Sequence, residues 1–279
     1  MTQDFSIQVM SRAQLDMAVE WAAREGWNPG LNDAALFHAA DPHGFLVGVV
    51  DGEPVACIAV VRYGEAYGFL GFYIALPAWR GKGLGFSVWQ AGLAHLGTRT
   101  IGLDGVVAQQ ENYRRSGFQL AHRNIRYGGH PQIAKPALPL ADPATISFDK
   151  LTAYDRRFFP APRDGFLSGW LTAPGHRSLA VVQNGELQGL GTIRPCREGH
   201  KVGPLYAATP QIAEALFASL AGGCSGPVFL DVPETNPAAV KLAEAAGLKP
   251  AFETARMYRG AAPKIDMTGL YGITTFELG

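Results

Sequence analysis

The chain has 279 residues, 24 basic and 24 acidic side chains, and 47% hydrophobic residues. This length is ample for a hydrophobic core and corresponds to one large or two ordinary domains. The balanced charge, which holds in both halves, excludes the strongly basic composition typical of proteins that bind nucleic acids.

No segment of the sequence indicates export, membrane insertion or metal binding. The start, MTQDFSIQVM, lacks a basic region followed by an apolar stretch, and no apolar run approaches the roughly 18–20 residues of a membrane span. The three cysteines lack CxxC spacing, and the seven histidines form no HExxH motif. We therefore expect a soluble cytoplasmic protein without a metal, whose partners include neither membranes nor nucleic acids.

The first half predicts a helix, a hairpin, a third strand, a second helix, a short strand and a short helix. The hairpin turns at Asp51–Gly52, a dipeptide typical of tight hairpin turns, and the Gly-rich segment 80–85 separates the third strand from the second helix. In chain order the predicted elements cover residues 11–25, 44–63 (the two strands of the hairpin), 66–76, 84–97, 100–107 and 110–117.

The second half repeats this order of elements. Three pairs of glycines carry the correspondence at nearly one offset: Gly185 lies 133 positions after Gly52, Gly203 lies 132 after Gly71, and Gly247 lies 130 after Gly117. Arg126 follows Gly117 by nine positions, and Arg256 follows Gly247 by nine positions. Several weak matches at one offset predict a tandem duplication of an α+β domain.

The two copies meet in a Gly- and Pro-rich stretch over residues 128–143, a composition that suits a linker. We therefore expect a first domain over residues 1–130, a linker over 131–143 and a second domain over 144–279.

The segment Arg80-Gly81-Lys82-Gly83-Leu84-Gly85 is a candidate phosphate cradle. It matches neither the Walker nor the Rossmann glycine pattern. A helix start presents unpaired N–H groups, however, and glycines let an anion approach the backbone, while Arg80 and Lys82 add positive charge. The alternative is a tight strand-to-helix turn flanked by solvated cations.

The run LPAWRGKGLG resembles the acyl-CoA-binding motif of the GNAT superfamily of N-acyltransferases, and Pro77 precedes Arg80 by three residues, as it often does there. With NYRRSGF, the similarity covers about residues 5–128. The segments GPLYAA, LDVPETNPAAV and YGITTFELG resemble the divergent second domain of some bacterial tandem members. The resemblance implies two tandem GNAT-like domains, each a mixed, mostly antiparallel sheet flanked by helices.

The resemblance implies that the protein transfers an acetyl or other acyl group from acyl-CoA, as donor co-substrate, to a primary amine by direct attack. The N–H groups of Gly81 through Phe86 would hold the CoA pyrophosphate, and the strand end before them would pair with the pantetheine. The implied donor-binding residues are Tyr73, Ile74, Ala75, Arg80, Gly81, Lys82, Gly83, Leu84, Gly85 and Phe86. Arg114 and Arg115 either bind the 3′-phosphate of CoA or belong to a solvated helix face.

Tyr113, four residues before Gly117, stands where many GNAT enzymes have the tyrosine that protonates the departing thiolate. A phenol suits this task because its pKa is similar to that of the thiol; the alternative is an aromatic residue that only packs. Val106 replaces the asparagine often found seven residues before this tyrosine, with Gln109, Gln110 or Asn112 as possible substitutes.

The general base is not identifiable from the sequence. Glu65 lies in a turn, and a water chain remains an alternative. The resemblance places the loop 25–32 near the acceptor. Asp33, which follows it, either binds or deprotonates the amine or has a cap or turn role, and Trp27 within it either lines the acceptor pocket or belongs to the core. The acceptor, a small-molecule or peptide amine, and the oligomeric state stay open.

The second copy lacks the residues that would make a donor site. Ile212, Ala215 and Phe217 stand where the first copy has Arg80, Gly83 and Gly85, and Ala243 stands at the tyrosine position. We expect this degenerate copy to be non-catalytic and to provide either one wall of the acceptor cleft or a stabilising lid. The competing function for the whole chain is a non-catalytic module that senses acyl-CoA or binds a partner.

Overall fold

A computed structural model describes residues 4–133 and 138–279. Residues 1–3 of the predicted first domain and residues 134–137 of the predicted linker lie outside the described residues. The first half contains, in chain order, β1 (Phe5–Val9), α1 (Arg12–Arg24), α2 (Asp33–Ala40), β2 (Phe45–Val50), β3 (Glu53–Tyr63), β4 (Tyr67–Ala75), α3 (Leu84–Leu96), β5 (Thr100–Val106), α4 (Gln110–Arg115) and β6 (Gln119–Gly129).

The second half repeats this order from α1 onward, as the sequence predicts, without a counterpart of β1 and with an added closing strand. It contains α5 (Phe148–Asp155), α6 (Asp164–Thr172), β7 (Arg177–Gln183), β8 (Glu186–Pro195), β9 (His200–Ala207), α7 (Pro210–Ala221), β10 (Val228–Pro233), α8 (Pro237–Ala245), β11 (Lys249–Arg259) and β12 (Leu270–Gly272). Short 3-10 turns cover Pro77–Trp79, Val107–Gln109 and Pro143–Thr145.

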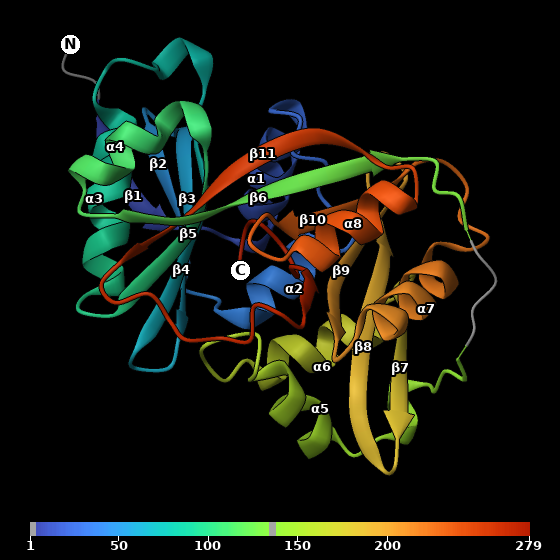
Figure 1. Cartoon of the computed structure of the whole chain (residues 1–279). Coiled ribbons are helices and arrows are strands. Elements are labelled where there is room, and N and C mark those ends of the chain that lie inside the picture. The colour runs from blue at the N-terminus through green and yellow to red at the C-terminus, as the bar shows by residue number, and fades with distance from the viewer. Residues whose placement is uncertain (1–3, 134–137) are drawn as a thin grey trace.

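All strands belong to one sheet in the order β1-β2-β3-β4-β5-β11-β6-β10-β9-β8-β7, with β12 paired to β9 (Figure 1). Only the β4–β5 and β9–β10 pairs are parallel among the described strand pairs. The predicted fold class, a mixed and mostly antiparallel sheet flanked by helices, is therefore confirmed. The structure adds that the sheets of the two copies join into one continuous sheet.

The sheets join because the two halves exchange their long strands β6 and β11. β11 of the second half pairs with β5 of the first, and β6 of the first half pairs with β10 of the second. β6 and β11 then pair with each other and run side by side between the halves (Figure 1). Periodicity in the sequence predicts each strand but not its neighbours, so this exchange had no signal in the sequence.

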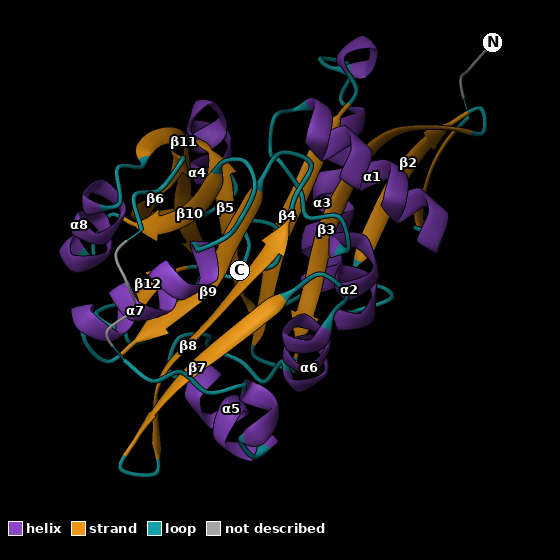
Figure 2. Cartoon of the chain, turned by 90° about the vertical axis from the view of Figure 1, so that its right-hand side faces the viewer, coloured by secondary structure: helices purple, strands orange, loops and turns teal. Residues whose placement is uncertain are grey.

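Helices cover both faces of the sheet, and residues of one strand alternate between them (Figure 2). In β3, Cys57, Ala59 and Val61 pack in the cluster that contains α1 and α2, whereas Ile58 and Val60 pack in the cluster that contains α3. Such alternation is the period of two that a strand buried on both faces requires. Within the described residues no helix is both long and apolar enough to cross a membrane.

Candidate active site

Strands β4 and β5 separate halfway along their length. Their parallel pairing runs from Tyr67 opposite Thr100 to Leu70 opposite Leu103. Beyond it, β4 carries a bulge where its register with β3 shifts, and Phe72 in the bulge has a φ of +45°. A bulge bends its strand, and a positive φ at a non-glycine residue is strained backbone of the kind found at functional sites. The bend leaves a gap in the sheet.

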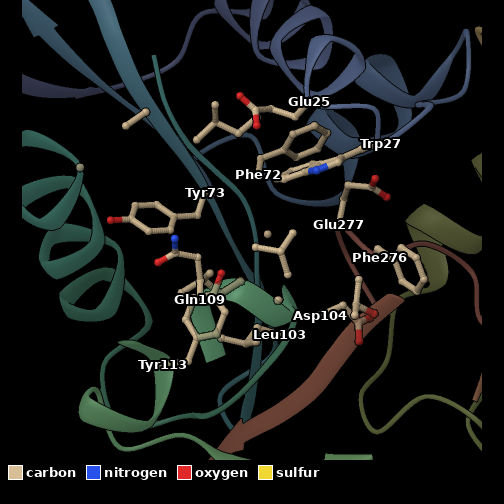
Figure 3. A pocket seen from close by; sticks show the side chains of 18 of the residues that line it. Glu25, Trp27, Phe72, Tyr73, Leu103, Asp104, Gln109, Tyr113, Phe276 and Glu277 are labelled. Carbon is tan, nitrogen blue, oxygen red and sulfur yellow. The ribbon is translucent and has the colours of Figure 1, made fainter. Parts of the chain in front are cut away.

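A cavity of about 490 Å³ fills this gap. One end is lined by the end of β4, the Gly-rich loop, Gln109 and Tyr113, while Trp27, Phe72, Phe276 and Glu277 lie at the other (Figure 3). Of the predicted donor-binding residues, the walls include Tyr73, Ile74, Ala75, Arg80, Gly81, Gly83 and Gly85. Lys82, Leu84 and Phe86 are not in the cavity wall, and Phe86 is 57% exposed.

The Gly-rich loop ends in a helix start that nothing caps. Gly81 and Gly83 adopt φ values of +77° and +82°, which other residues rarely adopt, and Gly83 provides no side-chain cap for α3. The first N–H of the helix with a partner is that of Ser87, bonded to the Gly83 carbonyl at 3.0 Å. The N–H groups of Leu84, Gly85 and Phe86 therefore remain available, together with the positive end of the helix dipole.

The two cations of this loop have different environments. Arg80 Nε donates to the Ala75 carbonyl at 2.8 Å, and its Nη2 lies 2.5 Å from Glu25. Arg80 therefore ties the loop to β4 and α1, and its charge is neutralised by a carboxylate. The ammonium of Lys82 lies 4.5 Å from the centre of the Trp79 ring and has no carboxylate within ion-pair distance among the described side chains.

Tyr113 is buried at the donor end of the cavity. Its ring stacks on Trp89 with centres 5.5 Å apart, and it lies so close to Gly105 that a Cβ there would approach the ring to 2.1 Å. Burial and the neighbouring Tyr73 raise the pKa of Tyr113 above its usual value of 10. Its hydroxyl donates to no described residue, which leaves it free for a ligand.

Of the sequence alternatives around Tyr113, the structure brings Gln109 to the cavity beside Val106. Asn112 lies outside the cavity wall and donates to Gln109 Oε1 at 2.6 Å. Of Gln109, Gln110 and Asn112, Gln109 alone lines this cavity. Arg114 pairs with Glu111 on an exposed helix face, and Arg115 is exposed as well.

The second half supplies a wall of the cavity through β11 and the segment after β12. Phe252 and Thr254 of β11 line it, as do Phe276 and Glu277. The segment lies directly on β4, because a Cβ at Gly71 would come within 2.2 Å of the Glu277 backbone oxygen. Gly71 is therefore needed for the chain to pass at this point.

Trp27 lines the cavity and is held from behind by cations of both halves. Its carbonyl accepts hydrogen bonds from Arg126 Nη1 at 2.8 Å and from Lys201 Nζ at 3.5 Å. The Arg126 guanidinium also lies 4.8 Å from the centre of the Phe276 ring. These contacts place two aromatic side chains opposite the Tyr73 and Tyr113 end (Figure 3).

Asp33 and Glu65 do not reach the cavity. Asp33 is fully buried, accepts from the Gly30 N–H at 2.7 Å and pairs with Arg194 Nε at 3.0 Å. Its position across the two halves indicates a structural role and gives no support to an acceptor role. The side chain of Glu65 is exposed and lies 3.5 Å from Arg99.

Three carboxylates line the cavity, and two of them are paired. Glu25 pairs with Arg80, and Asp104 of β5 accepts two hydrogen bonds from Arg256 of β11, at 2.8 and 2.6 Å. Glu277 is 2% exposed, and its Oε2 has no hydrogen-bond partner in the described part of the chain. Burial raises the pKa of both Asp104 and Glu277.

Sequence reasoning missed Glu25, Asp104 and Glu277. The signal in the sequence for Glu277 is weak: it is a single carboxylate within the otherwise uncharged closing stretch YGITTFELG.

The equivalent region of the second half is closed. Thr209 caps α7 by accepting from the Ile212 N–H at 3.3 Å, so this helix start has a partner of its own. Ile212, Ala215 and Phe217 are buried, and Ile212 occupies the space beside Gly189. Ala243 is buried too. The second copy thus has hydrophobic core where the first has the Gly-rich loop and Tyr113.

Comparison with known proteins identifies both halves separately. A profile described as "Acetyltransferase (GNAT) family" matches residues 11–118, and one described as "Acetyltransferase (GNAT) domain" matches residues 151–272. The chain is 31% identical over 280 residues to the holothin acyltransferase of a Pseudoalteromonas species, covering 99% of this chain and 95% of that protein.

Solved structures share the fold. A candidate acetyltransferase from Pyrococcus horikoshii matches with a TM-score of 0.85 at 20% identity, over 99% of this chain and 96% of that one. A tandem GNAT protein from the clavulanic acid biosynthesis pathway matches with a TM-score of 0.64 at 12% identity, over 93% of this chain and all of that one.

Proposed function

This chain belongs to the GNAT family of acetyltransferases in its tandem form, and we propose that its first half binds acetyl-CoA and performs the transfer while its second half completes the acceptor side. The family and the acyltransferase relative show acyl transfer from acyl-CoA, and they decide against a module that only senses the thioester. We keep the proposed boundaries of 1–130, 131–143 and 144–279, although the exchanged strands make the halves interdependent.

The donor site is proposed on the uncapped start of α3. The N–H groups of Gly81 through Phe86 bind the pyrophosphate, since they have no partner of their own and carry roughly half a positive charge from the helix dipole. Lys82 adds a free cation at the surface. Arg80 holds the loop against β4 and Glu25, so its role is positioning.

The thioester is proposed to lie along β4 beyond Leu70, where the strand has lost its partner β5. Tyr73, Ile74 and Ala75 offer backbone groups on this free edge to the pantetheine amides and the acyl carbonyl. A backbone N–H directed at that carbonyl stabilises the negative charge that develops on its oxygen in the transition state.

Tyr113 is proposed as the acid that protonates the leaving group. The amine nitrogen attacks the carbonyl carbon, a C–N bond forms, and the C–S bond breaks with its electron pair remaining on sulfur. Tyr113 donates its proton to that thiolate and regains one from water. Its raised pKa keeps the phenol protonated at neutral pH, so the proton is present at the start of each cycle.

The acceptor is proposed to be a small-molecule primary amine. The relative with 31% identity is named for the acylation of holothin. The cavity also has a limited volume of about 490 Å³, and the segment with Phe276 and Glu277 covers one side of it, which suits a compact acceptor more than a peptide chain.

The observation that carries this proposal is that the split between β4 and β5, the uncapped start of α3 and Tyr113 meet at one cavity. Titration with acetyl-CoA and with CoA, followed by thermal unfolding, tests donor binding; at 100 times Kd the ligand adds about 2.7 kcal/mol of stability. Thiol release is then measured over a panel of amines that includes holothin. We expect stabilisation by both ligands and release that depends on the amine.

A further inference from the structure

The segment that carries Glu277 is fixed against the first half. Tyr63 of β3 donates its hydroxyl proton to the Leu278 carbonyl at 3.0 Å, and the Leu278 N–H donates to Thr275 Oγ1 at 2.9 Å. The Glu277 backbone also contacts Gly71, the residue before Phe72. Together these contacts place Glu277 beside the bulge of β4. A residue of the second half is thus built into the site of the first.

The carboxylate at this position has no structural purpose that the described contacts explain. Glu25 and Asp104 form ion pairs, whereas Glu277 has no cation within ion-pair distance in residues 4–133 and 138–279. Burying a carboxylate without a partner is costly, and such groups concentrate at functional sites.

The charges that surround Glu277 come from four elements. Lys201 of β9, Arg126 of β6 and Arg194 of β8 act to lower its pKa, and Asp33 of α2 acts to raise it, but burial is the largest influence and the net direction is upward. Arg126 and Arg194 are neutralised by Asp231 and Asp33, and Lys201 donates to Trp27. Lys201 has no carboxylate partner among the described residues, but it too lies beyond ion-pair distance of Glu277, which therefore has no cation paired to it in the free protein.

We propose that Glu277 binds the ammonium group of the acceptor and removes its proton, so that the second half supplies the base for the reaction in the first. This inference rests on the proposed function. The carboxylate accepts one proton from R–NH₃⁺, and the neutral amine attacks the thioester carbon. The C–S bond breaks, Tyr113 protonates the thiolate, and the nitrogen loses its second proton through water, which returns a proton to Tyr113. The net change is one amide, one CoA thiol and one proton released to solvent when Glu277 ionises again.

The same arrangement selects the class of acceptor. The Glu277 end carries two carboxylates, those of Asp104 and Glu277, and four aromatic rings, namely those of Trp27, Phe72, Phe252 and Phe276. A flat apolar body fits between such rings, and a cationic amine fits beside Glu277. Because Arg256 neutralises Asp104, it is the unpaired carboxylate of Glu277 that repels an acceptor with its own carboxylate. The acceptor class is therefore a primary amine with a flat apolar body and no acidic group.

The variant Glu277→Gln tests whether Glu277 is the base. Glu277→Asp serves as the conservative variant and Glu253→Gln as the control. Glu253 is a carboxylate of the same half that is half-exposed, pairs with Arg123 and lies outside the cavity wall. We expect Glu277→Gln to lower kcat/KM for the amine by about 10²- to 10³-fold, because general-base catalysis contributes this much, and to remove the acidic limb of the pH profile. Glu277→Asp keeps part of the activity, and Glu253→Gln keeps all of it.

Thermal stabilisation by acetyl-CoA separates this role from the donor site, and it should be the same in Glu277→Gln as in the wild type. Activity of Glu277→Gln within about twofold of wild type, less than the smallest usual effect of losing a base, would overturn the role. A loss of acetyl-CoA binding in Glu277→Gln as large as its loss of activity would also overturn the role, since Glu277 would then act on the donor side or on the fold. If Glu277→Gln does not fold, a Glu277→Asp variant with wild-type kcat/KM and pH profile overturns it instead.

Failure of the proposed function would look different. The wild type would then show neither stabilisation by acetyl-CoA nor amine-dependent thiol release, and the role of Glu277 would fall with it.

Discussion

Arg126 of β6 and Asp231 of β10 stand directly opposite each other across the boundary between the two halves and form a buried, doubly hydrogen-bonded ion pair, with Nε–Oδ1 and Nη2–Oδ2 distances of 2.6 and 2.8 Å. Arg256 of β11 and Asp104 of β5 repeat this pair at the other exchanged strand. The two arginines hold equivalent positions in the sequence repeat. Each half therefore inserts an arginine on its exchanged strand opposite an aspartate of the other half.

Arg126→Met should lower the free energy of unfolding by about 3–5 kcal/mol, because it leaves the Asp231 carboxylate buried without its partner. Arg126→Met combined with Asp231→Leu should recover much of that loss. Urea unfolding measures both. Arg123→Ala is the control, since its partner Glu253 also joins β6 to β11 but the pair is half-exposed, and such pairs contribute about 0–1 kcal/mol. Equal losses in Arg126→Met and Arg123→Ala would contradict this account.

Residues 1–130 and 144–279 produced separately should not fold as independent domains. Each would lose the strand that the other half provides and would expose a long unpaired edge at β5 or β10. We expect weak or aggregated circular dichroism signals from the fragments alone and a one-to-one complex on co-expression. Two stable monomeric fragments with cooperative unfolding would show that the exchange is dispensable.

Gly83→Trp should abolish stabilisation by acetyl-CoA, because its side chain occupies the space in front of the free N–H groups of α3. Gly97→Trp is the matched control at the other end of the same helix, since Gly97 also has a positive φ and open space around its Cβ position. Gly97 has φ +63° and ψ −129°, so Trp there is at least as strained as at Gly83, and a loss confined to Gly83→Trp cannot come from backbone strain. We expect the acetyl-CoA Kd to rise more than about tenfold, or 1.4 kcal/mol, in the first and to be unchanged in the second. Equal Kd values in both would exclude the assigned cradle.

Tyr113→Phe should reduce kcat by about 10²-fold or more and leave acetyl-CoA binding unchanged, because the ring still stacks on Trp89 and only the proton is lost. Stability should change by less than about 0.5 kcal/mol, since the hydroxyl has no partner in the free protein. The raised pKa also means that the wild type keeps this acid protonated up to and beyond pH 10. An unchanged kcat at saturating donor would remove Tyr113 from the mechanism.

Glu277→Gln should stabilise the protein at neutral and alkaline pH while it lowers activity. Burial raises the folded pKa of Glu277 above its ordinary value of 4.5, so the folded state holds this proton more tightly than the unfolded state does. The stability due to Glu277 is therefore complete below about pH 4 and is lost as pH rises through the folded pKa. Glutamine does not ionise, so its advantage should appear in that window. Thermal unfolding from pH 4 to 9 measures it, and a constant difference between the two proteins would contradict this reasoning.

The hairpins and the strand-to-helix glycines could be predicted from the sequence because their causes are local, whereas Tyr113 is identified through the family resemblance. Asp51–Gly52 and Asn184–Gly185 have positive φ values in the two hairpin turns, as their residue types suggest. The buried face of α3 contains Val88, Trp89, Gly92 and Leu96, which follow helical spacing. Local backbone preference and periodicity fix such features before the chain folds.

The strand exchange and the acceptor side could not be predicted because their causes lie far apart in the sequence. Arg126 and Arg256 are visible as a repeated pair, but nothing nearby shows that each pairs with an aspartate of the other half. Glu277 reaches β4 through a contact with Gly71, more than 200 positions earlier. Asp33 illustrates the opposite case. It follows a loop expected near the acceptor, but its carboxylate forms an ion pair with Arg194 of the other half.

The most direct test of the account is the amine-dependent release of CoA thiol from acetyl-CoA, with the acylated amine followed by mass spectrometry, in the wild type and in Gly83→Trp. The account predicts that the wild type releases one thiol for each amide formed with a flat, carboxylate-free primary amine, and that Gly83→Trp releases none above the uncatalysed rate. Equal rates of release by the two proteins, or no release by the wild type with any amine, would contradict it.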